Sequence, residues 1–219
     1  AKAHLGDYKG ALEDLEAVMF VQPDAPDGYR LQGRVKLAMG DVEGGKKDLA
    51  TAIEKADEER KGWTHFSRGL ALYDLGETDA ALADLEKAIE LDPEGNDYAR
   101  FYVYLARAAK GEADAAAADL KAFLDTRDVK DDWYSRIVGF LTGKTTAEEL
   151  LEAAKADDEL TTKQHRCEAH WYIAAKLLIA GDQAKAAEHL DACLATNQYA
   201  FIEHESAAWA KKRLSPSQD

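Results

Sequence analysis

A GKT triplet at 143–145 is the first stretch whose residues could do chemistry, and it lies inside VGFLTGKTTAEEL (138–150). A phosphate-binding loop of the form GxxxxGK[ST] spaces two glycines so that backbone N–H groups converge on an anion at a helix N-terminus. Here Gly139 comes one position late, and Val138 stands where the motif requires glycine. The apolar residues before the triplet follow a helical stripe and not a β-strand. We therefore interpret the triplet as a turn between two helices.

Zinc-binding residue types gather closer to the C-terminus, with His165, Cys167 and His170 in one stretch and His189 and Cys193 in the next. Cys167 and His170 would share a helix face, and Cys193 could lie across from them. His189 is expected to point outward, so a tetrahedral set of four ligands does not close and we predict no metal site. Two interpretations of the cysteines stay open. They are buried thiols that act as small apolar side chains, or a disulfide, which needs Cα atoms within about 7 Å.

The other reactive side chains do not form a catalytic set. Carboxylates such as Glu13 and Asp84 are expected on the solvated faces of amphipathic helices. Ser135 and Ser206 have no histidine and aspartate in a recognisable setting, so no nucleophile is predicted. We predict no enzyme, no catalytic residue and no cofactor.

Composition limits the kinds of protein and partner. The chain has 219 residues, 46% of them hydrophobic, with few prolines and abundant Ala, Leu, Glu, Lys and Asp, which is typical of helices. No apolar run reaches 18 residues, so no membrane span is predicted. The formal net charge of −14 would repel a phosphate backbone, which argues against nucleic acid as a partner. The chain begins with Ala and carries no signal peptide, so we expect a processed or trimmed piece whose compartment cannot be assigned from its residues.

An internal repeat organises the chain. GDYKGALEDLEAVMFVQP (6–23) reappears as GETDAALADLEKAIELDP (76–93), and GDVEGGKKDLATAIEKAD (40–57) is a weaker copy between them. Each copy predicts the second helix of a pair, with a glycine ending the first helix. Gly33, Gly69 and Ala81 are small enough for two helices to cross closely.

These features resemble the tetratricopeptide repeat. The matching residues are Tyr29, Gly33, Gly45, Leu49 and Ala52 in one copy and Gly69, Ala81, Leu85, Ala88 and Pro93 in the next. Lys36 and Gln32 depart from the pattern, so that copy is expected to pack less tightly. The resemblance implies an all-α, right-handed α-solenoid of helix-turn-helix repeats with a C-terminal capping helix.

We expect a single solenoid domain over 1–219. Its helix pairs would cover about 1–25 (partial), 26–61, 62–96, 97–130, 131–160 (degenerate) and 163–198, followed by a cap at 200–214. In the degenerate pair, Thr145 and Glu148 predict a capping box at the start of the second helix. Residues 1–5 would be the tail of a first helix, which leaves Leu12, Leu15 and Met19 half covered and suggests further residues upstream.

The second half shows a closer resemblance. DYARFYVYLARAAKG (97–111), IVGFLTG (137–143) and the stretch from Cys167 to Leu214 are similar to NlpI-type tetratricopeptide lipoproteins of Gram-negative bacteria. This resemblance implies a periplasmic adaptor, often dimeric, that is anchored through a lipidated cysteine and brings cell-wall hydrolases to a protease. The lipid-bearing cysteine is not in this sequence, so cytoplasmic localisation also stays open.

The repeat resemblance also implies where a partner would bind, because this family uses the inner face of its first helices. We call the corresponding side chains the inner-face residues. They are Arg30, Arg34, Trp63, Phe66, Leu70, Tyr73, Tyr98, Phe101, Tyr102 and Leu105. Aromatic residues and Arg dominate binding hot spots. The alternative, that these side chains pack against neighbouring helices, stays open. The Lys and Asn residues that clamp a peptide carboxylate in some families are absent.

The sequence therefore favours a scaffold or adaptor that binds a protein or peptide segment. Two other functions stay open. One is a structural or assembly subunit that self-associates, as a homodimer for example, or joins a larger complex through its solenoid ends. The other is the accessory domain of an enzyme whose chemistry lies on another segment. The sequence does not name the partner.

Overall fold

The computed structural model describes residues 7–215, and this part of the chain is all-helical, with no strand. The predicted all-α fold is thus confirmed. The residues divide into two compact units, 1–103 and 104–219. The helices of the first unit are α1 (Tyr8–Val21), α2 (Pro26–Met39), α3 (Val42–Lys55), α4 (Glu58–Leu75) and α5 (Thr78–Leu91). Next come α6 (Ala99–Ala109), which begins in the first unit, and then α7 (Ala113–Thr126), α8 (Trp133–Leu141), α9 (Ala147–Ala153), α10 (Glu159–Ile179), α11 (Gln183–Ala195) and α12 (Ile202–Leu214).

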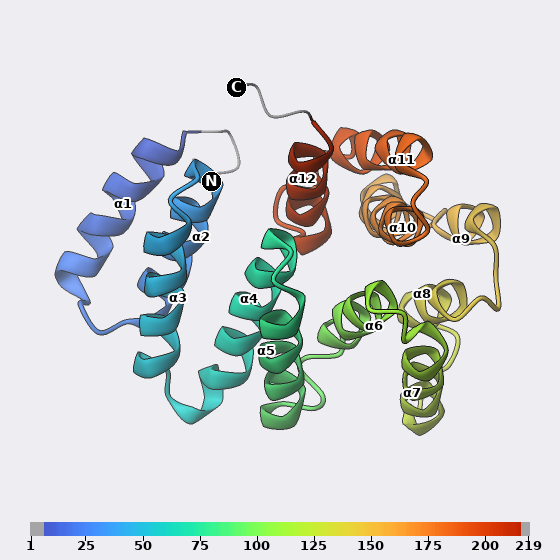
Figure 1. Cartoon of the computed structure of the whole chain (residues 1–219), viewed down its shortest axis with the longest axis horizontal. Helices are drawn as coiled ribbons and strands as arrows, with labels where there is room; N and C mark the ends of the chain where they lie inside the picture. The colour runs from blue at the N-terminus through green and yellow to red at the C-terminus, as the bar shows by residue number, and fades with distance from the viewer. Residues whose placement is uncertain (1–6, 216–219) are drawn as a thin grey trace. The chain divides into compact units, whose positions relative to one another are not determined.

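Consecutive helices of the first unit pack in antiparallel pairs, α2 on α3 and α4 on α5 (Figure 1). The pairs join through α1 on α2 and α3 on α4. The apolar stripe of each second helix is buried, as Leu49 and Ala52 of α3 and Leu85 and Ala88 of α5 show. Neither helix of a pair could cover this stripe alone, so pairing holds the fold together.

Glycine allows the close crossing of α2 and α3. A Cβ atom on Gly33 would lie 2.8 Å from the backbone oxygen of Gly45 and 2.9 Å from Cγ of Leu49. Both contacts are too short for carbon, and one of them is to backbone. A Cβ atom on Gly69 of α4 would likewise lie 2.9 Å from Cγ of Leu85. The predicted close approach at both glycines is confirmed.

Most pairs turn at a glycine in the left-handed conformation, which is cheap only without a Cβ atom. Gly76 ends α4 with φ of 82°, and its N–H and that of Glu77 bond to carbonyls of the last helical turn. The glycines with positive φ are Gly40, Gly76, Gly111, Gly143 and Gly181.

In the second unit, α8 and α9 form the shortened pair and α10 and α11 form a full one, on which α12 packs (Figure 1). The core of this unit includes Trp171 and Tyr172 of α10 and Leu190 of α11. Glu203 of α12 is also fully buried and accepts a hydrogen bond from the Tyr172 hydroxyl at 2.8 Å.

Some predicted helix bounds were wrong. The pairs expected at about 62–96 and 163–198 begin earlier, since α4 starts at Glu58 and α10 at Glu159. Asp57 and Asp158 cap these helices by accepting backbone N–H bonds from Arg60 and Thr161. The extra turns are polar and carry no apolar stripe, so the hydrophobic pattern did not predict them.

The capping box of the short pair also lies one residue later than predicted. Thr146 accepts from the backbone N–H of Glu149, and the Glu149 carboxylate accepts from that of Thr146. The prediction had placed it at Thr145 and Glu148.

The first helix leaves apolar side chains uncovered. Residues 1–6, where the tail of an earlier helix was expected, lie outside the described part of the chain. Leu12, Leu15 and Met19 are half-buried, as expected. Phe20 is 89% exposed and Val21 75%, although both are strongly apolar.

Candidate functional site

The inner-face residues fall into three groups by exposure. Only Trp63 is well exposed, at 43% of its surface. Four others are half-buried, namely Arg30, Arg34, Tyr73 and Tyr98. The remaining five are buried, namely Phe66, Leu70, Phe101, Tyr102 and Leu105. Packing thus accounts for half of the set, and Trp63 has the most side-chain surface to offer a partner.

The aromatic side chains of this set form a row across α4 and α6. The Trp63 and Phe66 ring centroids are 5.3 Å apart, and Phe66 meets the edge of Tyr102 at 6.4 Å. Tyr102 in turn lies 5.3 Å from Tyr73 with the rings nearly perpendicular. Such tilted and edge-on contacts are favourable for aromatic rings. The buried rings therefore hold Trp63, the exposed end of the row, in place.

Positive charge lies beside this exposed end. The Arg30 guanidinium is 5.7 Å from the Trp63 ring centroid, and it binds the exposed Asp27 carboxylate at 2.9 Å. Burial and the nearby Arg30 charge lower the pKa of Arg34 to about 10, although Asp74 raises it. Arg34 is therefore still charged at neutral pH, and Arg30 is the cation that lies over the exposed tryptophan.

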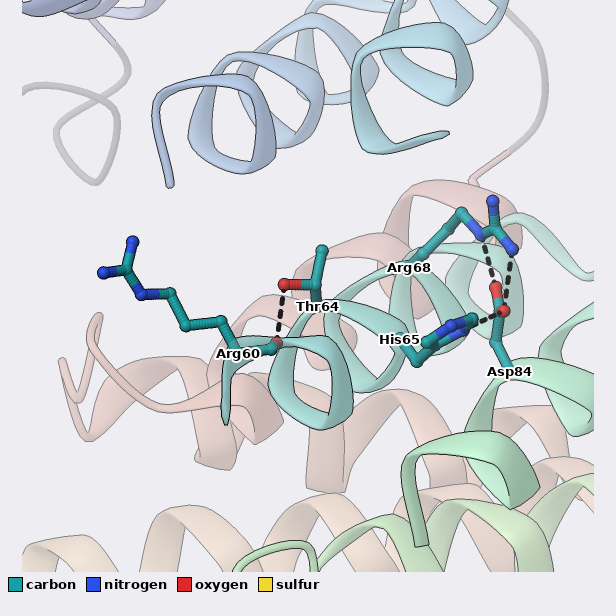
Figure 2. A network of polar contacts seen from close by, with 5 residues as sticks. All are labelled: Arg60, Thr64, His65, Arg68 and Asp84. Carbon is teal, nitrogen blue, oxygen red and sulfur yellow. Dashed lines mark hydrogen bonds and ion pairs between the residues drawn. The ribbon is translucent and has the colours of Figure 1, made fainter. Parts of the chain in front are cut away.

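A second cluster of chemical side chains joins α4 to α5, and Figure 2 shows it. The Asp84 carboxylate accepts hydrogen bonds from Nε of Arg68 at 2.5 Å and from Nη2 of Arg68 at 2.8 Å. Nδ1 of His65 lies 2.8 Å from the same carboxylate. One turn earlier, the Thr64 hydroxyl donates to the backbone oxygen of Arg60 at 2.8 Å. Asp84 is 4% exposed, so the prediction that it lies on a solvated face was wrong.

The position of Asp84 recurs along the chain, always three residues after the small residue of a second helix and just before a leucine. Its occupants are Asp14, Asp48, Asp84, Asp119 and His189. Three of the aspartates bind a cation on the first helix of their pair. The pairs are Lys36 with Asp48 at 2.6 Å, Arg68 with Asp84 at 2.5 Å and Arg107 with Asp119 at 2.5 Å. The Arg68–Asp84 contact of Figure 2 is thus one case of an ion pair that joins the two helices of a pair.

In the α10 and α11 pair a histidine replaces this aspartate. Nδ1 of His189 lies 2.9 Å from Nδ1 of His170, so the prediction that His189 points away from α10 was wrong. Burial, together with the neighbouring His189 and Arg166, lowers the pKa of His170 to about 4. Burial also lowers the pKa of His189. Both rings are therefore neutral at neutral pH, and the Nδ1 of one donates its N–H to the Nδ1 of the other. Among the described residues no three His, Cys, Asp or Glu side chains could hold a metal ion together.

The GKT triplet lies at the C-terminal end of α8. The backbone N–H groups of Lys144 and Thr145 donate to the oxygen of Gly139, and that of Gly143 donates to Phe140. These donors are therefore used within the turn, and a helix C-terminus repels anions. The interpretation of the triplet as a connector is confirmed.

The carbonyl end of α8 attracts donors, as this polarity requires. Nζ of Lys176 lies 3.1 Å from the oxygen of Phe140 and 3.2 Å from that of Leu141. The Tyr104 hydroxyl also donates to Leu141, at 2.6 Å. Lys176 and Tyr104 thus satisfy the last carbonyls of α8. This role could not be predicted from the sequence, because a repeat pattern relates residues within one helix pair and these contacts join residues 35 to 37 positions apart.

Comparison with protein families agrees with the repeat. Residues 62–94, which hold α4 and α5, match the family model described as "Tetratricopeptide repeat". Repeats of this family generally mediate protein–protein interactions, and the all-helical fold is typically a scaffold without enzymatic activity. None of the described helices is long and apolar enough to cross a membrane. Residues 62–94 are thus similar to one tetratricopeptide repeat, and the consecutive helix pairs of the described residues are those of an all-α solenoid.

Proposed function

We propose that this protein is a scaffold that binds a segment of a partner protein against the inner-face residues of α2, α4 and α6. The observation that carries the proposal is the exposed Trp63 ring with the Arg30 guanidinium beside it. Tryptophan and arginine are the residue types that most often dominate binding energy. The row of buried rings behind Trp63 lowers the entropy cost of fixing it on binding.

The chemistry beside Trp63 favours one kind of partner segment. The Arg30 guanidinium beside Trp63 binds Asp27, an exposed carboxylate on the same helix whose place an anion of a partner segment could take. We therefore expect the segment to carry a carboxylate next to an apolar side chain. Attraction of this kind weakens as salt screens exposed charges.

The test is affinity capture from extract of the native source with the full chain as bait, followed by measurement of the captured protein's affinity for purified variants. Trp63→Ala with Arg30→Ala is expected to weaken binding at least tenfold, since hot-spot truncations cost about 2 kcal/mol or more. Truncation of the buried Phe66 or Tyr102 would be a poorer test, because loss of either buried ring also destabilises the fold.

A matched control lies on α5, where Lys87 and Glu90 form an ion pair on the helix surface at 2.7 Å. Lys87→Ala with Glu90→Ala also removes two side chains, one of them a cation, and is expected to leave the affinity unchanged. Circular dichroism should show both variants folded. Equal affinity for wild type and the Trp63 variant would refute the proposed surface.

We further propose that the scaffold acts as a periplasmic adaptor of the NlpI type. The sequence resemblance of the second half supports this proposal, and no other observation does so specifically. Fractionation of cells that express the complete gene product would test it. Recovery of the protein in the cytoplasm would contradict it.

A second candidate function is self-association, which the exposed apolar end of α1 favours. Val18, Phe20 and Val21 together present a surface that a lone soluble helix does not normally leave in water. Light scattering across a concentration series should show a dimer that Phe20→Asp dissociates. A wild-type monomer at every concentration would exclude this candidate.

A further inference from the structure

Two thiols meet in the core of the α10 and α11 pair. Sγ of Cys167 on α10 lies 3.6 Å from Sγ of Cys193 on α11, and both side chains are fully buried. This distance is van der Waals contact between sulfur atoms, whereas a disulfide bond needs about 2.05 Å. The two side chains already point at each other from adjacent helices, so bond formation needs only a small approach.

The surroundings of the pair are compatible with a bond. Sγ of Cys193 lies 3.8 Å from the backbone oxygen of Glu203 on α12, a weak contact whose loss costs little. Small residues, Ala169 of α10 and Ala186 of α11, are buried in the same helix pair. No charged side chain is hydrogen-bonded to either sulfur among the described contacts.

We propose that Cys167 and Cys193 form an intramolecular disulfide when the chain folds in the presence of a small-molecule disulfide such as oxidised glutathione. One cysteine thiolate attacks oxidised glutathione to give a mixed disulfide and releases one glutathione thiolate. The second cysteine thiolate attacks the protein sulfur of the mixed disulfide and releases the other. The net reaction oxidises two protein thiols to one disulfide and reduces oxidised glutathione to two molecules of glutathione.

Burial decides when the reaction occurs. Both thiols are inaccessible in the folded pair, and the neighbouring Cys167, together with burial, raises the pKa of the Cys193 thiol. Thiolate attack therefore requires unfolded or locally opened chain. We expect the bond to form during oxidative refolding. In the same buffer it should form only slowly when the reduced protein is already folded.

The consequence is a covalent link between the two helices on which α12 packs. The bond would close a loop from residue 167 to residue 193 and is expected to shift the unfolding equilibrium toward the folded state by about 100-fold. It would act on the stability of the second unit only, and it rests on neither the partner-binding surface nor the self-association surface.

The test refolds the full chain from denaturant with reduced and oxidised glutathione, blocks thiols with N-ethylmaleimide under denaturing conditions and measures the intact mass. We expect no maleimide adduct, a mass two hydrogens lower, and a tryptic species that links CEAHWYIAAK (167–176) to the 186–211 peptide. A sample refolded with dithiothreitol should carry two adducts and unfold at lower denaturant.

The control variant Cys167→Ala should carry one adduct, and its circular dichroism reports whether it folds. Should it fail to fold, the linked tryptic species of the wild type still decides the matter. Two adducts on the wild type after oxidative refolding, or a link found only between two chains on a non-reducing gel, would overturn the proposal.

Discussion

Buried ionisable side chains decide much of the chemistry at the residue scale. Burial raises the pKa of Glu203 to about 7 despite the Tyr172 hydrogen bond, and lowers that of His170 to about 4. Both side chains are constraints on stability, and their effects have opposite signs. The folded state holds the Glu203 proton more tightly than the unfolded chain does, and it holds the His170 proton less tightly.

Glu203→Gln is expected to stabilise the protein at pH 8 by about 3 kcal/mol, because burial of the ionised Glu203 carboxylate destabilises the folded state at this pH. The glutamine keeps a hydrogen-bond acceptor for Tyr172. The folded pKa lies above the unfolded 4.5, so the gain should shrink as pH falls from about 7 and vanish below about 4.5. Urea unfolding at several pH values measures it. Glu13→Gln on the exposed side of α1 is the control, and a Glu203 gain that is independent of pH would contradict this account.

His189→Asp restores the carboxylate found at this position in other pairs. It should raise the pKa of His170 above 6.5, because an anion then replaces a neutral ring 2.9 Å away. In the wild type, stability is lost as pH falls from 6.5 toward 4. In the variant, the sign reverses and stability is lost as pH rises through the new pKa. Titration of the His170 ring by NMR decides this, and a pKa that stays near 4 would show that burial alone controls it.

At the scale of elements, each helix pair combines a close apolar crossing with one polar bond. Leu49 and Leu85 fill the crossing, and the aspartate just before each of them binds a cation on the facing helix. The burial supplies most of the stability, while the ion pair fixes how the two helices slide against each other. Lys36 is an example of such an ion pair. It stands at a repeat position that is usually aromatic, and its ammonium group binds Asp48.

Gly33→Ala is expected to destabilise the protein by about 1–3 kcal/mol, because its methyl group would meet the backbone of α3 at 2.8 Å. The matched control is Gly139→Ala in α8, where a Cβ atom has no neighbour closer than 3.5 Å. That change should stabilise by up to about 1 kcal/mol through helix propensity. Thermal unfolding compares the two variants. Equal effects of both would mean that the α2 and α3 crossing has room to relax.

At the scale of the whole molecule, the formal charge of −14 coexists with cations that are mostly bound to carboxylates. Exposed pairs such as Lys87 with Glu90 contribute little individually. The carboxylates in excess of the cations repel one another at low salt, and this repulsion destabilises the compact folded state. The pH dependence of global stability therefore reflects this background as well as Glu203 and His170.

Between about pH 6.5 and 4.5 the wild type is expected to lose stability less steeply than Glu203→Gln, because the gain at Glu203 opposes the losses at His170 and at the other histidines whose pKa is lowered by burial. Removing the Glu203 carboxylate should therefore make the loss of stability on acidification steeper. Glu203→Gln should leave a stability that falls steadily as the solution is acidified, which denaturant titration at constant ionic strength would detect. Equal slopes for the wild type and Glu203→Gln in this interval would contradict the role given to Glu203.

Much of the fold and little of the site could be predicted from the sequence. The helix pairs follow from a pattern that repeats, since the glycine turns, the small crossing residues and the leucine stripe are all local. The first turns of α4 and α10 were missed because they are polar and depend on the caps Asp57 and Asp158. For the site, residue types and repeat position proposed ten side chains, but could not separate the exposed Trp63 from the buried Phe66 beside it.

The sequence by itself determined the class of this protein, because each unit buries its apolar stripe only by pairing and stacking, and that requirement is written into residue spacing. Only the tertiary structure decided which groups meet across helices. It brought His189 to His170, buried Asp84 against both His65 and Arg68, and placed Cys167 against Cys193. Such contacts join residues 16 to 26 positions apart, and their distances depend on how two helices cross.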